Sequence, residues 1–258
     1  MTTASKRLLL AGETWFSYGI HQKGFSAYAT GTYDEGQTEL VAALEASGWS
    51  VTHIPNHLAT EDFPWSAEDL GAYDVVILSD ISADTLHLHP DTFVRGRRTP
   101  DRLAEIARYV AEGGSFLMVG GYMSFSGFEG KARFHGTGVE QVLPVTMLGY
   151  DDRVETPAGV TPEVVAGDHP ILAGVPGDWP HFLGYNRVRR DGGDVVLAFG
   201  EDPLLVVAEH GAGRTAAFTS DCSPHWGSPE FMAWDGYAPF WDGLLSWLAR
   251  RASGQGGA

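Results

Sequence analysis

The chain has 258 residues, of which 43% are hydrophobic and 19% charged, so it is long enough and apolar enough to bury the core of one globular domain. Its formal net charge of −16 would repel phosphate backbones and anionic lipid surfaces, which argues against nucleic acid and membranes as partners. The single cysteine, Cys222, excludes an intrachain disulfide and a cysteine-rich zinc site.

The amino-terminal segment is polar and basic until the short apolar run of Leu8 to Leu10. That run is too short for a signal peptide, and no later run is long enough to span a bilayer. A cytoplasmic location is therefore expected.

The first half of the chain alternates short apolar runs with amphipathic stretches, the pattern of βαβ units around a parallel sheet. A polar loop containing His21 and Lys23 is predicted after the first strand. A second helix is expected to open at Thr99-Pro100-Asp101 and to end before Gly113-Gly114. Strands are predicted at residues 7–13, 50–54, 74–80 and 115–121, and helices at 34–47 and 101–112.

The second half is less regular and predicts an antiparallel extension of the sheet. The turn Gly211-Ala212-Gly213 between two apolar runs indicates a hairpin. An aromatic-rich helix is predicted from Pro229 to Arg251, and its apolar face suits either self-association or the core. Residues 253–258 are expected to be a flexible tail after a single domain of residues 1–252. The predicted strands are at 145–150, 182–189, 194–199, 204–210 and 214–220.

The segment from Phe116 to Gly127 is a strand that runs into Gly120-Gly121 and then into polar and aromatic residues. In elbow-type enzymes such a turn presents a nucleophile above the sheet edge. Here the turn holds Tyr122, suited to hydrogen bonding or proton transfer, and Ser124, which could attack an acyl group if a base were in reach. A purely structural glycine-rich turn with a buried tyrosine explains the pattern equally well.

The segment from Ala217 to Gly227 gathers a carboxylate, a thiol and an imidazole after another strand. Asp221 could orient His225, and His225 could act as a base or bind a metal. Cys222 could be a nucleophile if His225 lowered its pKa, but a lone cysteine beside a core strand favours inert packing.

The segment from Gly12 to Phe25 follows the first strand, where open α/β sheets commonly bind ligands. Glu13, His21 and Lys23 could bind a polar ligand there or pair internally.

Four motifs together resemble the putative glutamine amidotransferase family of cytoplasmic proteins, in the class I glutamine amidotransferase-like superfamily. The resemblance extends to Gly12-Glu13, His21-Gln22-Lys23-Gly24 and Ser79-Asp80-Ile81 and covers nearly the whole chain. The motifs are Gly120-Gly121-Tyr122-Met123-Ser124-Phe125, Asp152-Arg153-Val154-Glu155, Leu183-Gly184-Tyr185-Asn186 and Thr219-Ser220-Asp221 with Pro224-His225-Trp226.

The resemblance implies a flavodoxin-like α/β fold, with a mostly parallel sheet flanked by helices and a site at the carboxyl edge of the sheet. The sequence departs from the amidotransferase pattern in two places: Tyr122 replaces the elbow cysteine, and Trp226 and Gly227 follow His225 where the pattern continues to a glutamate. The implied catalytic residues are His225, Asp221, Tyr122 and Ser124, and the implied substrate-binding residues are Glu13, His21, Lys23, Gly121, Phe125 and Trp226.

Three functions follow in order of preference. The first is a hydrolase or transferase acting on a small polar metabolite, with His225 and Asp221 as base and Tyr122 or Ser124 as acid or nucleophile. The second is a metabolite-binding or assembly module that has lost the chemistry, and the third is a true glutaminase using Cys222. No cofactor is predicted, the question of a metal stays open, and a homo-oligomer is expected.

Overall fold

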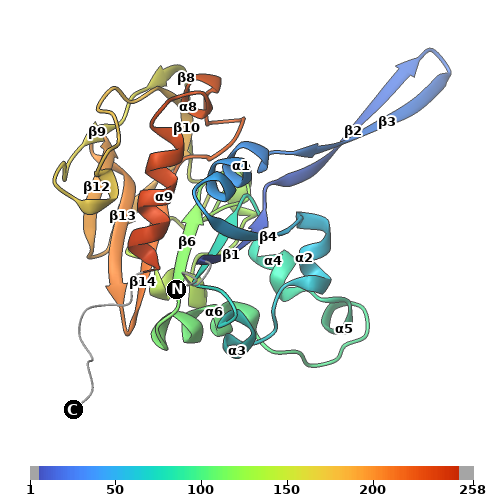
Figure 1. Ribbon diagram of the computed structural model, residues 1–258. Helices are drawn as coiled ribbons and strands as arrows, with labels where there is room; N and C mark the ends of the chain where they lie inside the picture. The colour runs from blue at the N-terminus through green and yellow to red at the C-terminus, as the bar shows by residue number, and fades with distance from the viewer. Residues whose placement is uncertain (1–5, 250–258) are drawn as a thin grey trace.

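The side chains of β1 (Lys6–Gly12) alternate between two hydrophobic cores, one on each side of a central sheet. Leu8 and Leu10 face one core, whereas Leu9 and Ala11 face the other. A strand buried on both faces reads as a continuous apolar run, as this one does. The computed structural model describes residues 6–249 (Figure 1).

The central sheet has eight strands in the order β4-β1-β5-β6-β14-β13-β12-β9. Its first five strands pair in parallel, and numbered among themselves they run 2-1-3-4-5, the flavodoxin order. The last three are antiparallel, so the predicted flavodoxin-like α/β fold with an antiparallel extension is confirmed. The remaining bounds are β4 (Trp49–Ile54), β5 (Val75–Ser79), β6 (Ser115–Val119), β9 (Glu163–Val164), β12 (Asp194–Phe199), β13 (Asp202–His210) and β14 (Gly213–Phe218).

Helices cover both faces of the sheet. On one face lie α1 (Thr38–Ala46) and α9 (Tyr237–Leu248), whose buried residues share a core with Leu8 and Leu10. The opposite core takes its helical residues from α2 (Asn56–Asp62), α3 (Ala67–Leu70), α4 (Ala83–His87), α6 (Arg102–Ala111) and α7 (Gly138–Val142). The helix predicted to open at Thr99-Pro100-Asp101 is α6, and Asp101 caps it by accepting hydrogen bonds from the amides of Leu103 and Ala104.

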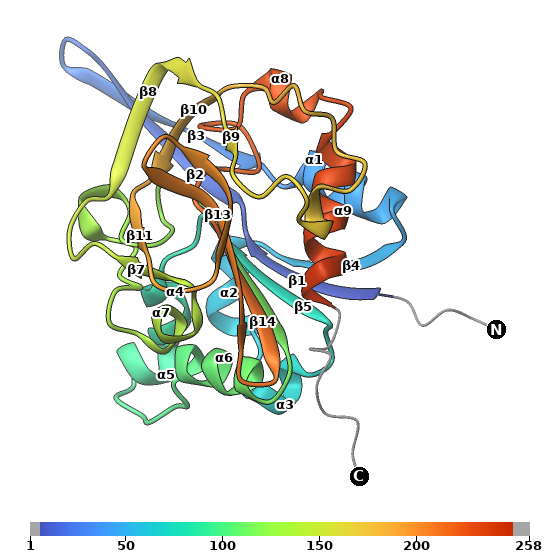
Figure 2. The same cartoon turned by 90° about the vertical axis from the view of Figure 1, so that its left-hand side faces the viewer.

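Short antiparallel ribbons lie beside the sheet (Figure 2). The segments predicted as single strands at 145–150 and 182–189 are shorter or divided. The pairs are β8 (Arg153–Val160) with β10 (Phe182–Asn186), and β7 (Val145–Met147) with β11 (Val188–Arg190). The remaining short helices are α5 (Pro90–Phe93), η1 (Phe128–Gly130), η2 (Pro170–Leu172) and α8 (Pro229–Met232).

The predicted polar loop after β1 is wrong, because residues 14–35 form a long β-hairpin that projects from the body (Figure 1). Its strands are β2 (Thr14–Lys23) and β3 (Ser26–Glu35), and every residue of β2 has a partner in β3. Apolar and polar residues alternate along β2, which is the period of a strand. The hairpin occupies residues 34–35, so α1 begins only at Thr38 rather than at Asp34.

The single helix predicted from Pro229 to Arg251 is wrong. The chain forms two helices there, α8 and α9, with a turn from Ala233 to Gly236 between them. In α9, Phe240, Trp241 and Leu244 are fully buried, so its apolar face belongs to the core and not to a self-association surface. The predicted tail at 253–258 lies outside the described residues. Within residues 6–249, no helix combines the length and the apolar character needed to cross a bilayer.

Candidate functional site

Two carboxylates stand where β1 and β5 end, at the point where the strand order reverses. Glu13 follows β1 and Asp80 follows β5. In doubly wound sheets the crevice at this reversal is the usual ligand site. Asp221 joins them from β14, two strands away from β5, by way of the extended segment Thr219–Ser220. All three carboxylates are buried, Asp221 completely.

Serine hydroxyl groups bind two of these carboxylates, Glu13 and Asp221, and one hydroxyl lies between them. Ser79 donates a short hydrogen bond to Oε1 of Glu13. The hydroxyl oxygen of Ser223 lies between Glu13 and Asp221, 2.8 Å from Oε2 of Glu13 and 3.2 Å from Oδ1 of Asp221. One hydroxyl group thus lies within hydrogen-bond distance of two carboxyl groups that are far apart in the sequence.

Burial raises the pKa values of these acids because a charged carboxylate loses its hydration. The pKa of Glu13 rises to about 7, first through burial and then through the charge of Asp80. The pKa of Asp221 lies well above its usual range, through burial and then through Glu13 and Asp80. Burial also raises the pKa of Asp80, although the amide of Met123 and the charge of His225 act the other way. The cluster therefore retains protons near neutral pH.

His225 lies next to Asp221 but is not hydrogen-bonded to it. Its Nδ1 lies 4.0 Å from Oδ2 of Asp221, and its side chain is 36% exposed. Within the described part of the chain, that Oδ2 is buried and has no hydrogen-bond partner. An unpartnered buried carboxylate oxygen is uncommon, and here it is available to stabilise a positive charge on the imidazole.

Three of the site residues have unusual backbone conformations. Glu13 has φ 57°, Asp80 has φ 43° and His225 has φ 120°. Non-glycine residues rarely adopt positive φ, and such strain costs about 1–3 kcal/mol per residue. The three strained residues lie where three loops meet. This indicates that the positions of their side chains matter more than the local stability of the backbone.

Aromatic rings surround the imidazole. The ring centroid of His225 lies 4.7 Å from that of Trp15 and 5.8 Å from that of Tyr122. Trp226 packs against Tyr122 at 5.5 Å and donates its indole N–H to Glu155. Trp226 is buried behind Tyr122, whereas Trp15 and Tyr122 are partly exposed and can stack on the flat apolar face of a ligand, as a sugar ring presents.

The elbow after β6 holds Tyr122 next to His225. The Tyr122 hydroxyl donates to Glu155 at 2.9 Å, and its pKa is raised by burial and then by that carboxylate. Gly121, at φ 144°, is required because a side chain there would approach Oδ1 of Asp80 to 2.8 Å. The predicted proximity of Tyr122, Gly121 and His225 therefore agrees with the geometry.

Ser124 does not stand beside His225 as a nucleophile would. It is fully buried, and its hydroxyl accepts a hydrogen bond from the amide of Asp80 at 3.0 Å. Phe125 is also fully buried and packs in the core between the sheet and α6. These two residues shape the loop, and the structure gives neither a contact with the imidazole.

His21 and Lys23 lie on the outer half of the hairpin and not at the sheet edge. His21 is seven residues beyond Thr14 on β2, about 24 Å along an extended strand. Its imidazole stacks on Tyr28 and reaches Thr30 at 3.1 Å. Within one chain they do not join Glu13 in a pocket as expected, because residues 14–35 form an extended hairpin and not a folded loop.

Several residues of the site were not among those expected from the sequence. Asp80 was noted only as a strand end, and Trp15 only as part of a loop. Asp152 and Asn186 hold the elbow: Asn186 accepts from the amide of Gly121 at 3.0 Å and donates to Asp152 at 2.8 Å. Asp152 and Asn186 both lie in motifs that carry the resemblance to the family, and this could have identified them as residues of the site. The other omitted residues are Ser79, Ser223, Glu155 and Gly36.

Cys222 is buried, and burial raises the pKa of its thiol well above the usual value. A thiol in this environment is a poor nucleophile, which agrees with the interpretation of inert packing. Glu13, Asp221 and Cys222 present donor atoms within 4.8 Å of one another, a spacing that could hold a metal ion. Both oxygens of Glu13 already accept serine hydroxyls, however, so the free Oδ2 of Asp221 is the readily available ligand.

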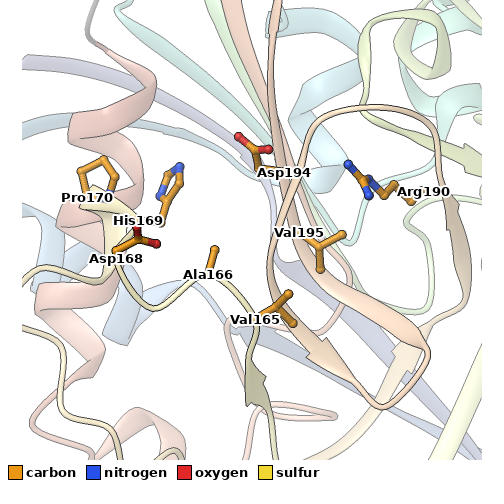
Figure 3. Close-up of a pocket in the computed structure, with 8 residues that line it drawn as sticks. All are labelled: Val165, Ala166, Asp168, His169, Pro170, Arg190, Asp194 and Val195. Atoms are coloured by element: carbon orange, nitrogen blue, oxygen red, sulfur yellow. The ribbon is translucent and has the colours of Figure 1, made fainter.

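A separate open cavity of about 500 Å³ lies at the antiparallel edge of the sheet, where β9 and β12 pair (Figure 3). Its main polar groups already serve the local backbone. Arg190 donates to the carbonyls of Gly192 and Gly193, and His169 accepts from the amide of Ile171. This cavity has no buried carboxylate cluster comparable to that at Glu13.

This chain is similar to known proteins in both sequence and fold. Residues 7–250 match the family model described as putative glutamine amidotransferase. Two solved cytoplasmic proteins from Salmonella typhimurium superpose with a TM-score of 0.91 each. One is 44% identical and the matched region covers 95% of this chain and 99% of that one. The other is 41% identical, with 95% and 100% covered.

A more distant likeness concerns the fold alone. The β-galactosidase from Rahnella sp. R3 is 14% identical with a TM-score of 0.50, over 83% of this chain and 27% of that enzyme. No curated protein matches the sequence.

Proposed function

This chain belongs to the putative glutamine amidotransferase family, and we propose that it is a cytoplasmic acid–base enzyme, a hydrolase or transferase, acting on a small polar metabolite. The observation that carries the proposal is the buried carboxylate pair behind His225, with Ser223 bridging Glu13 and Asp221. Packing of the core does not require these buried acids. Burying a carboxyl group without a cationic partner lowers the stability of the fold. Titratable groups perturbed in this way mark functional sites.

In the proposed reaction His225 is the general base. It removes a proton from water or from a hydroxyl of the substrate, and Asp221, 4.0 Å away, stabilises the imidazolium that forms. Ser223 lies between Glu13 and Asp221 and can pass a proton between them, so Asp221 faces the imidazole as a carboxylate when Glu13, with its pKa of about 7, holds the proton. Tyr122 hydrogen-bonds the substrate or protonates its leaving group from beside the imidazole.

This route differs from glutamine hydrolysis through a thioester, which needs a thiolate at the elbow. The elbow residue is Tyr122, and the thiol of Cys222 is buried. Direct attack by a base-activated water or hydroxyl requires no covalent enzyme intermediate, and it uses the groups present at the edge of the sheet.

The charges of the site select among substrates. Three carboxylates meet there, and the neighbouring guanidinium of Arg153 is already paired with Asp151 at 2.8 Å. The negative charge that remains on these partly protonated acids would repel an anionic substrate, so the proposed substrate is uncharged or cationic. The aromatic rings around His225 favour a molecule with a flat face, such as a sugar, a nucleoside or an aromatic amide.

The test is turnover of a panel of uncharged and cationic chromogenic glycosides, esters and amides by the wild type and by His225→Gly. Glycine is chosen because it tolerates the φ of 120° at this position, so the fold should survive. We expect about a 100-fold or greater loss of kcat in His225→Gly. His210→Ala, at the opposite end of the β13–β14 hairpin, and Cys222→Ser should retain wild-type rates. A wild-type rate in His225→Gly would refute the assignment.

A second candidate, a metabolite-binding module, is favoured by the rings of Trp15 and Tyr122 beside His225, since stacking on a ligand needs no catalytic group. Thermal stabilisation of the wild type by a panel member, persisting in His225→Gly and without product, would select this function over the enzyme.

A further inference from the structure

The hairpin formed by β2 and β3 is a long, two-stranded arm. It has ten residues in each strand, paired from Thr14 with Glu35 to Lys23 with Ser26. At about 3.4 Å per residue the arm is about 30 Å long. Both views show it extending away from the body (Figures 1 and 2). A two-stranded ribbon alone in water is marginally stable, so an arm of this length needs a covering surface.

The strand register divides the arm into one apolar and one polar face, because directly paired residues share a face. The apolar face includes Phe16 beside Tyr33, Tyr18 beside Gly31 and Ile20 beside Ala29. The opposite face pairs Ser17 with Thr32, Gly19 with Thr30 and His21 with Tyr28, and the His21 and Tyr28 rings stack on each other. We call the first set, residues 16, 18, 20, 22, 27, 29, 31 and 33, the apolar arm face.

The apolar arm face is exposed. Phe16 is 49% exposed, Tyr18 78% and Ile20 83%. Contiguous apolar surface of this kind marks an interaction site in soluble proteins. By contrast, the polar side chains of the other face bond to one another, as Ser17 and Thr32 do with Asp34. One face is therefore adapted to water and the other to a partner.

We propose that the apolar arm face docks on the body of a second copy of this chain, in a two-fold dimer in which the two arms are exchanged. One face of about 30 by 10 Å covers about 300 Å². A one-sided contact with another protein would bury about 600 Å² in total, which is typical of a lattice contact rather than of a stable complex. Reciprocal exchange doubles this to about 1,200 Å², the lower bound of stable interfaces.

The charge distribution also fits a second copy. The chain has a net charge of −16, so two copies repel each other over most of their surface. From Phe16 to Tyr33 the only charged residue is Lys23, and this segment contains no aspartate or glutamate. The arm can thus approach an acidic copy without repulsion, and Lys23 near its tip is attracted to that copy.

The test compares two substitutions on adjacent positions of the arm with opposite facings. Ile20→Asp places a charge on the apolar arm face, and Thr30→Asp places the same charge on the polar face, next to His21. Sedimentation equilibrium from about 1 to 100 μM protein gives the dimer dissociation constant of each variant. Far-UV circular dichroism verifies that each remains folded.

We expect the wild type and Thr30→Asp to be dimers and Ile20→Asp to dissociate at least about 100-fold more readily. A photo-crosslinking residue at Phe25, the arm tip, should link to the body of the other copy. A monomeric wild type at 100 μM, or equal dissociation constants for the two variants, would overturn the proposal. Cross-links confined to a single chain would overturn arm exchange. These readouts do not depend on the proposed enzymatic function.

Discussion

The residues at the site combine strain with buried charge, and both features lower stability. Glu13, Asp80 and His225 adopt positive φ, and the carboxyl groups of Glu13 and Asp80 are almost completely buried. A protein retains such groups where they support function. At the residue scale, then, the protonation of Glu13 should be visible in the stability of the whole protein.

We predict that the free energy of unfolding decreases as pH rises from about 4.5 to about 7. The pKa of Glu13 is near 4.5 in an unfolded chain and about 7 in the folded one, so the folded state holds the proton more tightly. The stabilisation is complete below the unfolded pKa and is lost as pH passes the folded pKa, a difference of about 3 kcal/mol. Urea denaturation at several pH values measures it.

The matched variant is Glu13→Gln, which mimics the protonated acid and should flatten that part of the profile. The exposed Glu39, at the start of α1, provides the control Glu39→Gln, which should leave the slope unchanged. The same slope in Glu13→Gln as in the wild type would assign the pH dependence to other groups.

At the element scale, the elbow loop of residues 120–127 is fixed by one buried carboxylate. Asp152 accepts the amides of Ser126 and Gly127 and the side-chain amide of Asn186. Replacing it would leave several buried donors without a partner, at about 1–3 kcal/mol each. Burial also raises the pKa of Asp152, which these hydrogen bonds counteract.

We therefore predict that Asp152→Ala lowers the free energy of unfolding by about 3 kcal/mol or more. Asp151→Ala should lower it by less than about 1 kcal/mol, because Asp151 is partly exposed and pairs mainly with Arg153. Urea denaturation of both variants measures the two losses of unfolding free energy. Equal losses for these two neighbouring aspartates would show that the elbow does not depend on Asp152.

The elements could be predicted from the sequence where burial imposes a regular pattern. β1, β5 and β6 are apolar runs between polar or glycine residues, so their ends, and with them Glu13 and the elbow, could be located. The hairpin was missed because its aromatic residues alternate with polar ones in a segment that also contains glycines and charges. The bond from Ser223 to Glu13 could not be predicted, since it joins positions 210 apart through side-chain orientation alone.

At the scale of the whole molecule, the net charge of −16 makes self-repulsion a general cost of folding. We predict that raising NaCl from about 20 to about 500 mM increases Tm by several degrees, because salt screens exposed like charges. Differential scanning calorimetry provides the measurement, with an equal osmolality of a neutral solute as control. A Tm that is unchanged or lower in salt would show that ion pairs outweigh the repulsion.

The position of β14 in the middle of the sheet has a consequence for synthesis on the ribosome. β6 ends at Val119, but its neighbour β14 is completed only at Phe218, about a hundred residues later. At about 5–20 residues per second the nascent chain exposes the open edge of β6 for about 5–20 s. Asp221 also arrives only after that interval, so the carboxylate cluster is assembled late in translation. Mutations that slow the docking of β14 should therefore lower the soluble yield in cells more than they lower equilibrium stability.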